Sequence, residues 1–230
     1  SQDVCSGFFV TQRFVTQASQ SSWDRRTELD VFLTTPSAQS ACGMEDFMKV
    51  VDMHCDTIAA LYENKEKGWT LQDNRLHIRL DKMKQGDYLL QNFALFVCTE
   101  NCEDPYQQAL TLADCFDRQM ALFPEQIGQV RCYNDILENQ KNGRISALLT
   151  IEEGAVCQGS LEKLREFYDR GVRMLTLTWN FPNEIGFPNF AISGDGKPDR
   201  TVPNTKDGLT EFGFLFLEEM ERLGMIVDVS

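Results

Sequence analysis

The feature that most constrains the fold is an alternation of short apolar segments with amphipathic ones after Met48. Apolar segments bounded by turn residues predict buried strands over residues 49–53, 89–98, 145–151, 172–178 and 225–229. Between them, apolar residues repeat every three or four positions, which predicts helices beginning near Thr57, Asp104, Asn134, Ser160 and Thr210. Because strands that alternate with helices form βαβ units, we expect a parallel sheet covered by helices. A doubly wound sheet and a (β/α)8 barrel both fit this order.

Residues 1–47 differ from the rest of the chain. They are rich in Ser, Thr and Gln, and no period of 2 or 3.6 is sustained along them. We leave this segment unassigned, either as a poorly ordered extension or as non-native sequence ahead of a start at Met48. The domain with a recognisable pattern covers residues 48–230.

The composition excludes several classes of protein. Asp and Glu outnumber Lys and Arg by 35 to 22, and the net charge of −13 has the wrong sign for a nucleic-acid partner. No apolar run approaches the roughly 20 residues of a membrane-spanning helix, and we recognise no secretory signal. The eight cysteines include no Cys-x-x-Cys pair, so we expect reduced thiols in a cytoplasmic protein.

The first candidate site follows the first predicted strand, in the sequence Asp52-Met-His54-Cys-Asp56. Residues i and i+2 of a strand point to the same side, so we expect His54 and Asp56 to project together, with Cys55 pointing away. An imidazole beside a carboxylate suits a divalent metal such as Zn²⁺. The alternative is a histidine that is hydrogen-bonded to a nearby carboxylate in a tight turn.

The second candidate is Glu152, at the end of the strand predicted over residues 145–151. In a barrel its carboxylate would reach the same mouth as His54 and Asp56, and carboxylates can bridge two metal ions. An ordinary acidic turn at the end of a strand is the alternative. Metal ligands at the strand ends favour a barrel over a doubly wound sheet. Five strands are too few for a barrel of about 250 residues, so we expect the front part of a (β/α)8 TIM barrel, truncated after about five strands.

The connection from residue 179 to residue 208 is long and holds four of the seven prolines. Loops of this length in a compact domain often form a lid or a binding loop. Trp179 and Asn180 open the connection directly after the fourth predicted strand, over the expected barrel mouth. The alternative is a solvated insertion.

Together, four segments resemble the membrane (renal) dipeptidase family of zinc peptidases in its bacterial form. The segments are VVDMHCDT (50–57), LLTIEEG (148–154), RGVRMLTLTWN (170–180) and DGLTEFGFLFLEEMERLGMIVDVS (207–230). The resemblance implies a metal-dependent (β/α)8 hydrolase that binds two zinc ions and cleaves dipeptides. It implies that His54 and Asp56 ligate one zinc ion, that Glu152 bridges both ions, and that Trp179 and Asn180 lie on the substrate side.

The resemblance also implies a mechanism in which a hydroxide between the two zinc ions attacks the peptide carbonyl. The family's further ligand histidines, its substrate-binding arginine and its acid/base aspartate belong after Ser230. We therefore assign no catalytic acid or base within these residues and expect no turnover from them alone. The alternatives are another barrel metal-dependent amidohydrolase or a non-catalytic truncated product. Assembly as a homodimer stays open.

Overall fold

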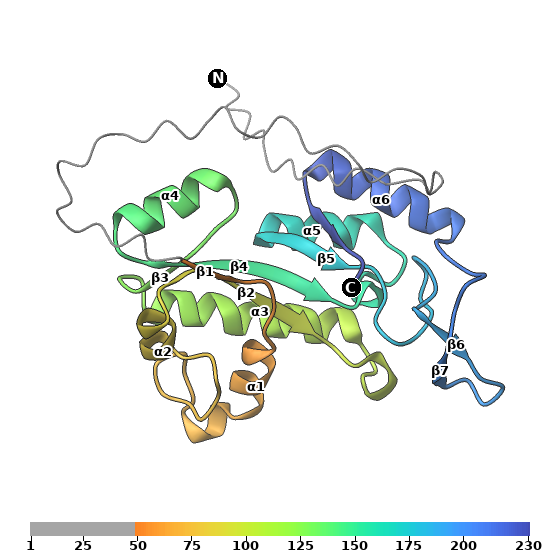
Figure 1. The fold of residues 1–230 in the computed structure, drawn as a ribbon, viewed down its shortest axis with the longest axis horizontal. Coiled ribbons are helices and arrows are strands. Elements are labelled where there is room, and N and C mark those ends of the chain that lie inside the picture. Colours follow the sequence, from red (N-terminus) through yellow and green to blue (C-terminus); the bar gives the residue numbers. More distant parts are fainter. Residues whose placement is uncertain (1–48) are drawn as a thin grey trace, which may run out of the picture. The chain divides into compact units, whose positions relative to one another are not determined.

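A parallel sheet forms the centre of the fold (Figure 1). The computed structural model describes residues 49–230, so the extension assigned to residues 1–47 lies outside the described residues. Five strands follow the order β1-β2-β4-β5-β8, all parallel, and β3 pairs with the start of β4. Their bounds are β1 Val50–Asp52, β2 Tyr88–Phe96, β3 Ile127–Gln129, β4 Ile145–Glu152, β5 Val172–Thr176 and β8 Ile226–Asp228.

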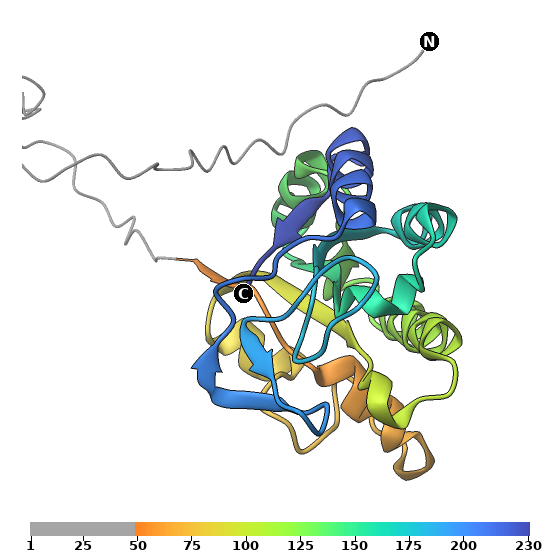
Figure 2. The ribbon, with the colours of Figure 1, turned by 90° about the vertical axis from the view of Figure 1, so that its right-hand side faces the viewer.

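Most of the helices cover the convex side of the sheet. In Figure 2, α6, α5, α3 and α1 follow one another in an arc round the outside of the curled sheet. Within residues 49–230 the α-helices are α1 Thr57–Glu63, α2 Leu80–Gln85, α3 Pro105–Leu122, α4 Tyr133–Lys141, α5 Leu161–Arg170 and α6 Glu211–Leu223. Among the residues that the structure describes, none of these helices is long and apolar enough to cross a membrane.

The two faces of the sheet bury different sets of side chains. Leu149 belongs to the main core between the sheet and its outer helices, which also holds the fully buried pair Phe93 and Phe116. The preceding residue, Leu148, points to the opposite face and packs in a small cluster with Ile136 of α4. This two-sided burial explains why the strands are apolar almost throughout, since both faces are covered.

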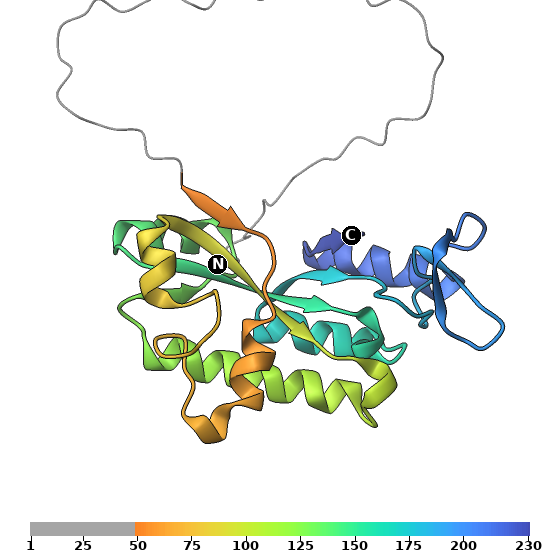
Figure 3. The ribbon, with the colours of Figure 1, turned by 60° about the horizontal axis from the view of Figure 1, so that its bottom comes forward.

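The curled sheet is half of a barrel and confirms the predicted fold class, an α/β fold consistent with part of a (β/α)8 barrel. Figure 3 shows β1 and β8 as the two outer strands of the described sheet. The predicted strands and helices all occur, with bounds that differ by a few residues. The sequence pattern did not predict α2 or β3, because each is too short for its apolar period to repeat clearly.

The long connection after β5 contains an antiparallel hairpin. Its strands are β6 Phe190–Ile192 and β7 Pro198–Pro203. An isolated bridge between Gly186 and Leu209 closes the base of this connection beside α6. The connection therefore carries its own hairpin and is closed by this bridge just before α6.

Candidate metal centre

His54 and Asp56 lie in the turn between β1 and α1. The predicted strand ran to residue 53, but β1 ends at Asp52, so strand alternation is the wrong reason for their shared direction. Two hydrogen bonds shape the turn instead. The His54 N–H donates to Asp52 Oδ1 at 3.2 Å, and the Cys55 carbonyl accepts from the Ala94 N–H on β2 at 3.0 Å. Cys55 is buried in the main core, so its two neighbours face outward.

Glu152 is the last residue of β4. It is in register with Phe96 on β2 and with Thr176 on β5, in the middle of the sheet. The other residues of β4 are buried, and this side chain is 19% exposed. β4 therefore places one carboxylate at the carboxyl edge of an otherwise buried strand.

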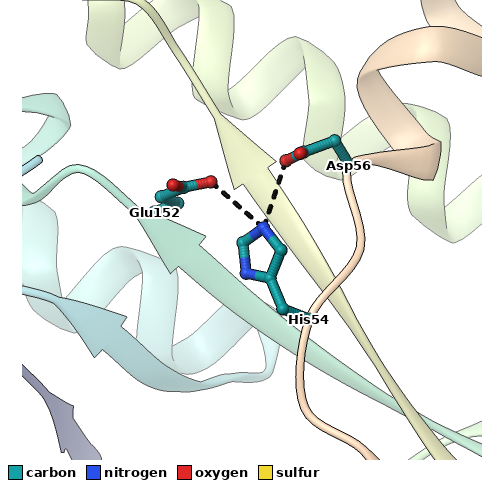
Figure 4. A group of neighbouring side chains, drawn as sticks. All are labelled: His54, Asp56 and Glu152. Carbon is teal, nitrogen blue, oxygen red and sulfur yellow. Dashed lines mark ion pairs between the residues drawn. The ribbon is translucent and has the colours of Figure 1, made fainter. Parts of the chain in front are cut away.

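The structure brings His54, Asp56 and Glu152 together (Figure 4). His54 Nε2 lies 3.2 Å from Glu152 Oε2 and 3.4 Å from Asp56 Oδ1. One ligand atom from each residue lies within 4.8 Å of the other two. In Figure 4 the imidazole and both carboxylates point into the same space, at the ends of β2 and β4.

The electrostatics of this cluster centre on Glu152. Burial raises the pKa of its carboxyl above the ordinary value, and the charges of Asp56 and Asp228 act in the same direction. The imidazole of His54 opposes them. Clustered carboxylates repel one another until a cation joins them, so the cluster is suited to a positive ion.

The donor set fits a divalent metal. One imidazole nitrogen and two carboxylate oxygens are ligands that Zn²⁺ and other borderline ions accept. The remaining exposure of His54 and Asp56 leaves an open side, as a metal that also binds water or substrate requires. These three residues are therefore able to hold a metal ion at the carboxyl edge of the sheet.

Asp228 is a further acidic residue at this edge, and the sequence prediction did not include it among the site residues. It ends β8 and accepts hydrogen bonds from Thr176 Oγ1 and from Ser230. Burial would raise its pKa, but these hydrogen bonds outweigh burial and lower the pKa below the ordinary value. The signal was available, because Asp228 follows an apolar strand in the same way as Glu152.

Trp179 and Asn180 follow β5 at the same edge of the sheet. The Trp179 ring meets the ring of Phe96 edge to face, with centroids 4.9 Å apart, and also lies near Phe181. Phe96 is in register with Glu152 on the adjacent strand β4, so Trp179 contacts a residue at the same level of the sheet as the cluster. Asn180 is half-buried beside it. Among residues 49–230, no hydrogen bond or ion pair joins Trp179 or Asn180 to His54, Asp56 or Glu152.

Comparison with known proteins identifies the family. The model of the membrane dipeptidases, peptidase family M19, matches residues 39–230. The chain belongs to the membrane dipeptidase family. Dipeptidase 3 of Rattus norvegicus is 31% identical over an alignment of 202 residues that covers 84% of this chain and 38% of the rat protein. The chain thus spans much less than the full length of this relative.

Solved structures of metallopeptidases share the fold. The metallopeptidase "dipeptidase AC" superposes with a TM-score of 0.66 at 24% identity, over 79% of this chain and 56% of the other. A metallopeptidase from Rhodobacter sphaeroides superposes with a TM-score of 0.65 at 22% identity, over 79% and 58% of the two chains. At these identities the likeness supports the half-barrel fold. Membership of a metallopeptidase family also implies a metal, which agrees with the donor set at the carboxyl edge.

Proposed function

We propose that this protein is a zinc-dependent dipeptidase whose metal site includes His54, Asp56 and Glu152. The convergence of these three side chains at the carboxyl edge of the sheet is the observation that carries the proposal. In (β/α)8 enzymes this edge is where the active site lies. A chain of the membrane dipeptidase family that presents metal ligands there has the first requirement for hydrolysis.

Each of the three residues has a distinct role in the proposal. His54 and Asp56 would hold one ion, and Glu152 would be a ligand that this ion shares with a second one. When bound, zinc supplies a Lewis acid for the peptide carbonyl and lowers the pKa of a coordinated water towards about 7. Asp228, with its hydrogen bonds from Thr176 and Ser230, keeps a further negative charge at this edge.

The proposed substrate is a dipeptide. The metallopeptidase from Rhodobacter sphaeroides was solved with a phosphinate mimic of the dipeptide L-Ala-D-Ala. We assign the same class of substrate to this protein, with Trp179 and Asn180 on the wall beside the metal centre. The flat indole of Trp179, held against Phe96, offers an apolar surface to a small side chain.

A substrate screen tests the proposal. The protein at its natural full length, loaded with zinc, should release free amino acids from L-Ala-D-Ala and other dipeptides. It should leave an N-acetylated, C-amidated Ala-Ala and a phosphoester intact, and it should lose activity with a chelator. Hydrolysis of the blocked amide or of the phosphoester in preference to dipeptides would instead favour another barrel metal-dependent hydrolase.

A further inference from the structure

Glu153, the residue after Glu152, combines two unfavourable features. Its φ is +94°, in the region that favours glycine, and it shares a positive φ only with Asp87 and Gln158 among the described residues other than glycine. Its side chain is also buried, at 1% exposure. Backbone strain and burial of an acidic group each cost free energy. Such a combination persists only where other contacts compensate for it.

The compensating contacts are hydrogen bonds to the Glu153 carboxylate. Oε1 accepts from the Ala155 N–H at 3.0 Å and from Asn183 Nδ2 at 2.8 Å. Burial raises the pKa of this carboxyl, and the backbone N–H groups of Ala155 and Trp179 and the Asn183 amide act in the opposite direction. Asn183 belongs to the connection after β5, so the buried carboxylate joins the end of β4 to that connection.

Asn183 extends this link through the connection. Its Nδ2 also donates to the Leu177 carbonyl at 2.8 Å, so the amide spans both ends of the segment 177–183. Its Oδ1 accepts from the N–H groups of Ile185 and Gly186 at 2.8 and 3.1 Å. Every hydrogen-bonding group of this amide is used by the turn or by Glu153.

Close packing surrounds the same link. Ile185 is 1% exposed, and a Cβ on Gly154 would come within 2.5 Å of Ile185 Cδ1 and 2.6 Å of the Leu177 carbonyl oxygen. Only glycine allows the turn to approach the end of β4 this closely. The segment 177–186 is thus held by both hydrogen bonds and contact.

We propose that Glu153 is a positioning residue that holds segment 177–186, and with it Trp179 and Asn180, at the rim of the metal centre. That this rim faces substrate rests on the proposed function, but the attachment itself does not. The proposal explains why a strained, buried acidic residue stands where glycine would relieve the backbone. The Glu153 carboxylate accepts the hydrogen bond from Asn183 and so attaches segment 177–186 to the end of β4, which compensates for the strained backbone.

The test uses Trp179 as a reporter in the whole chain, with Trp23 and Trp69 changed to Phe. Acrylamide quenching of Trp179 is measured without metal for the reference protein and for Glu153→Gly, Glu153→Gln and Asn183→Ala. Asp87→Gly is the matched control, because it also relieves a positive φ, and the Asp87 side chain forms only a surface ion pair with Lys49. Circular dichroism establishes that each variant is folded.

We expect Glu153→Gly and Asn183→Ala each to raise the quenching constant of Trp179 by about twofold or more, since an unanchored segment opens locally. Their double variant should show no further increase, because both remove one contact. Glu153→Gln, which keeps an oxygen acceptor, should restore most of the protection, and Asp87→Gly should leave it unchanged. An unchanged quenching constant in folded Glu153→Gly would overturn the proposal, as would a doubling in Asp87→Gly.

The test of the attachment by Glu153 gives a result that can be separated from the test of the proposed function. Trp179 quenching is measured on the metal-free chain, whereas the function is tested by dipeptide hydrolysis in the presence of zinc. Protection of Trp179 that depends on Glu153, without dipeptide hydrolysis, would keep the anchor and reject the dipeptidase. Dipeptide hydrolysis together with a Trp179 quenching constant that Glu153→Gly does not change would keep the dipeptidase function and reject the attachment by Glu153.

Discussion

His54 Nε2 and Glu152 Oε2 lie 3.2 Å apart, although one residue follows the first strand of the sheet and the other ends β4. The contact exists because β1, β2 and β4 are parallel neighbours whose carboxyl ends meet at one edge. Burial raises the pKa of Glu152, and the nearby carboxylates of Asp56 and Asp228 raise it further. This arrangement is unfavourable for anions alone and favourable once a cation is present.

The ion pairs of Glu219 make stability depend on pH. Hydrogen bonds from Arg222 and then from Arg165 hold the pKa of Glu219 at about 2, below that of an unfolded chain. The folded-state pKa is depressed, so this stabilisation is complete above about pH 4.3 and is lost as pH falls towards 2. Urea midpoints measured from pH 6 down to 3 should fall less steeply for Glu219→Gln than for the unmodified protein. Parallel curves for the two proteins would show that α5 and α6 do not depend on this charge.

Gly213 should resist replacement by alanine although it lies within α6. Alanine favours a helix over glycine by about 1 kcal/mol. A Cβ at this position would, however, lie 2.0 Å from the carbonyl oxygen of Ile185, a backbone atom that no side-chain rotation can move. We expect Gly213→Ala to lower the free energy of unfolding by about 2 kcal/mol. Gly208→Ala, where a Cβ would meet no atom within 4 Å, is the control and should change stability little.

Two buried thiols, Cys55 and Cys157, should be unreactive in the folded protein. Burial raises the pKa of Cys55 to about 11 and that of Cys157 to about 12. At pH 8 roughly one Cys55 thiol in a thousand or fewer is ionised, and the thiolate is the reactive form. Iodoacetamide labelling read by peptide mass spectrometry should modify the half-buried Cys98 and Cys132 before Cys55 and Cys157. Equal labelling of Cys55 and Cys98 under native conditions would contradict the packing of the β1–α1 turn.

Much of the fold was predictable from the sequence because its strands and helices carry strong local patterns. The convergence of His54, Asp56 and Glu152 was predictable in outline, since each follows an apolar strand and parallel strands share a carboxyl edge. Their role as metal ligands stays a prediction. The geometry of the His54–Asp56 turn was not predictable, because it depends on Asp52 and on the N–H of Ala94 from another strand.

The link between Glu153 and Asn183 could not be read from the sequence either. Local patterns place Glu153 in an acidic turn and Asn183 in a polar loop, and both assignments are correct as far as they go. Their hydrogen bond is a tertiary contact between separate segments, set by how the connection after β5 folds back on β4. A positive φ at a residue other than glycine leaves no local sequence signal.

The most direct test of the central claim is a calorimetric zinc titration of the chain and of Glu152→Gln. The Gln variant keeps the shape of the side chain but removes its charge. Zinc affinity should fall at least about tenfold, or about 1.4 kcal/mol, whereas Glu162→Gln, at an exposed position on α5, should bind zinc as the unmodified chain does. Equal zinc affinity in the Glu152→Gln and unmodified chains would contradict a metal centre built on His54, Asp56 and Glu152.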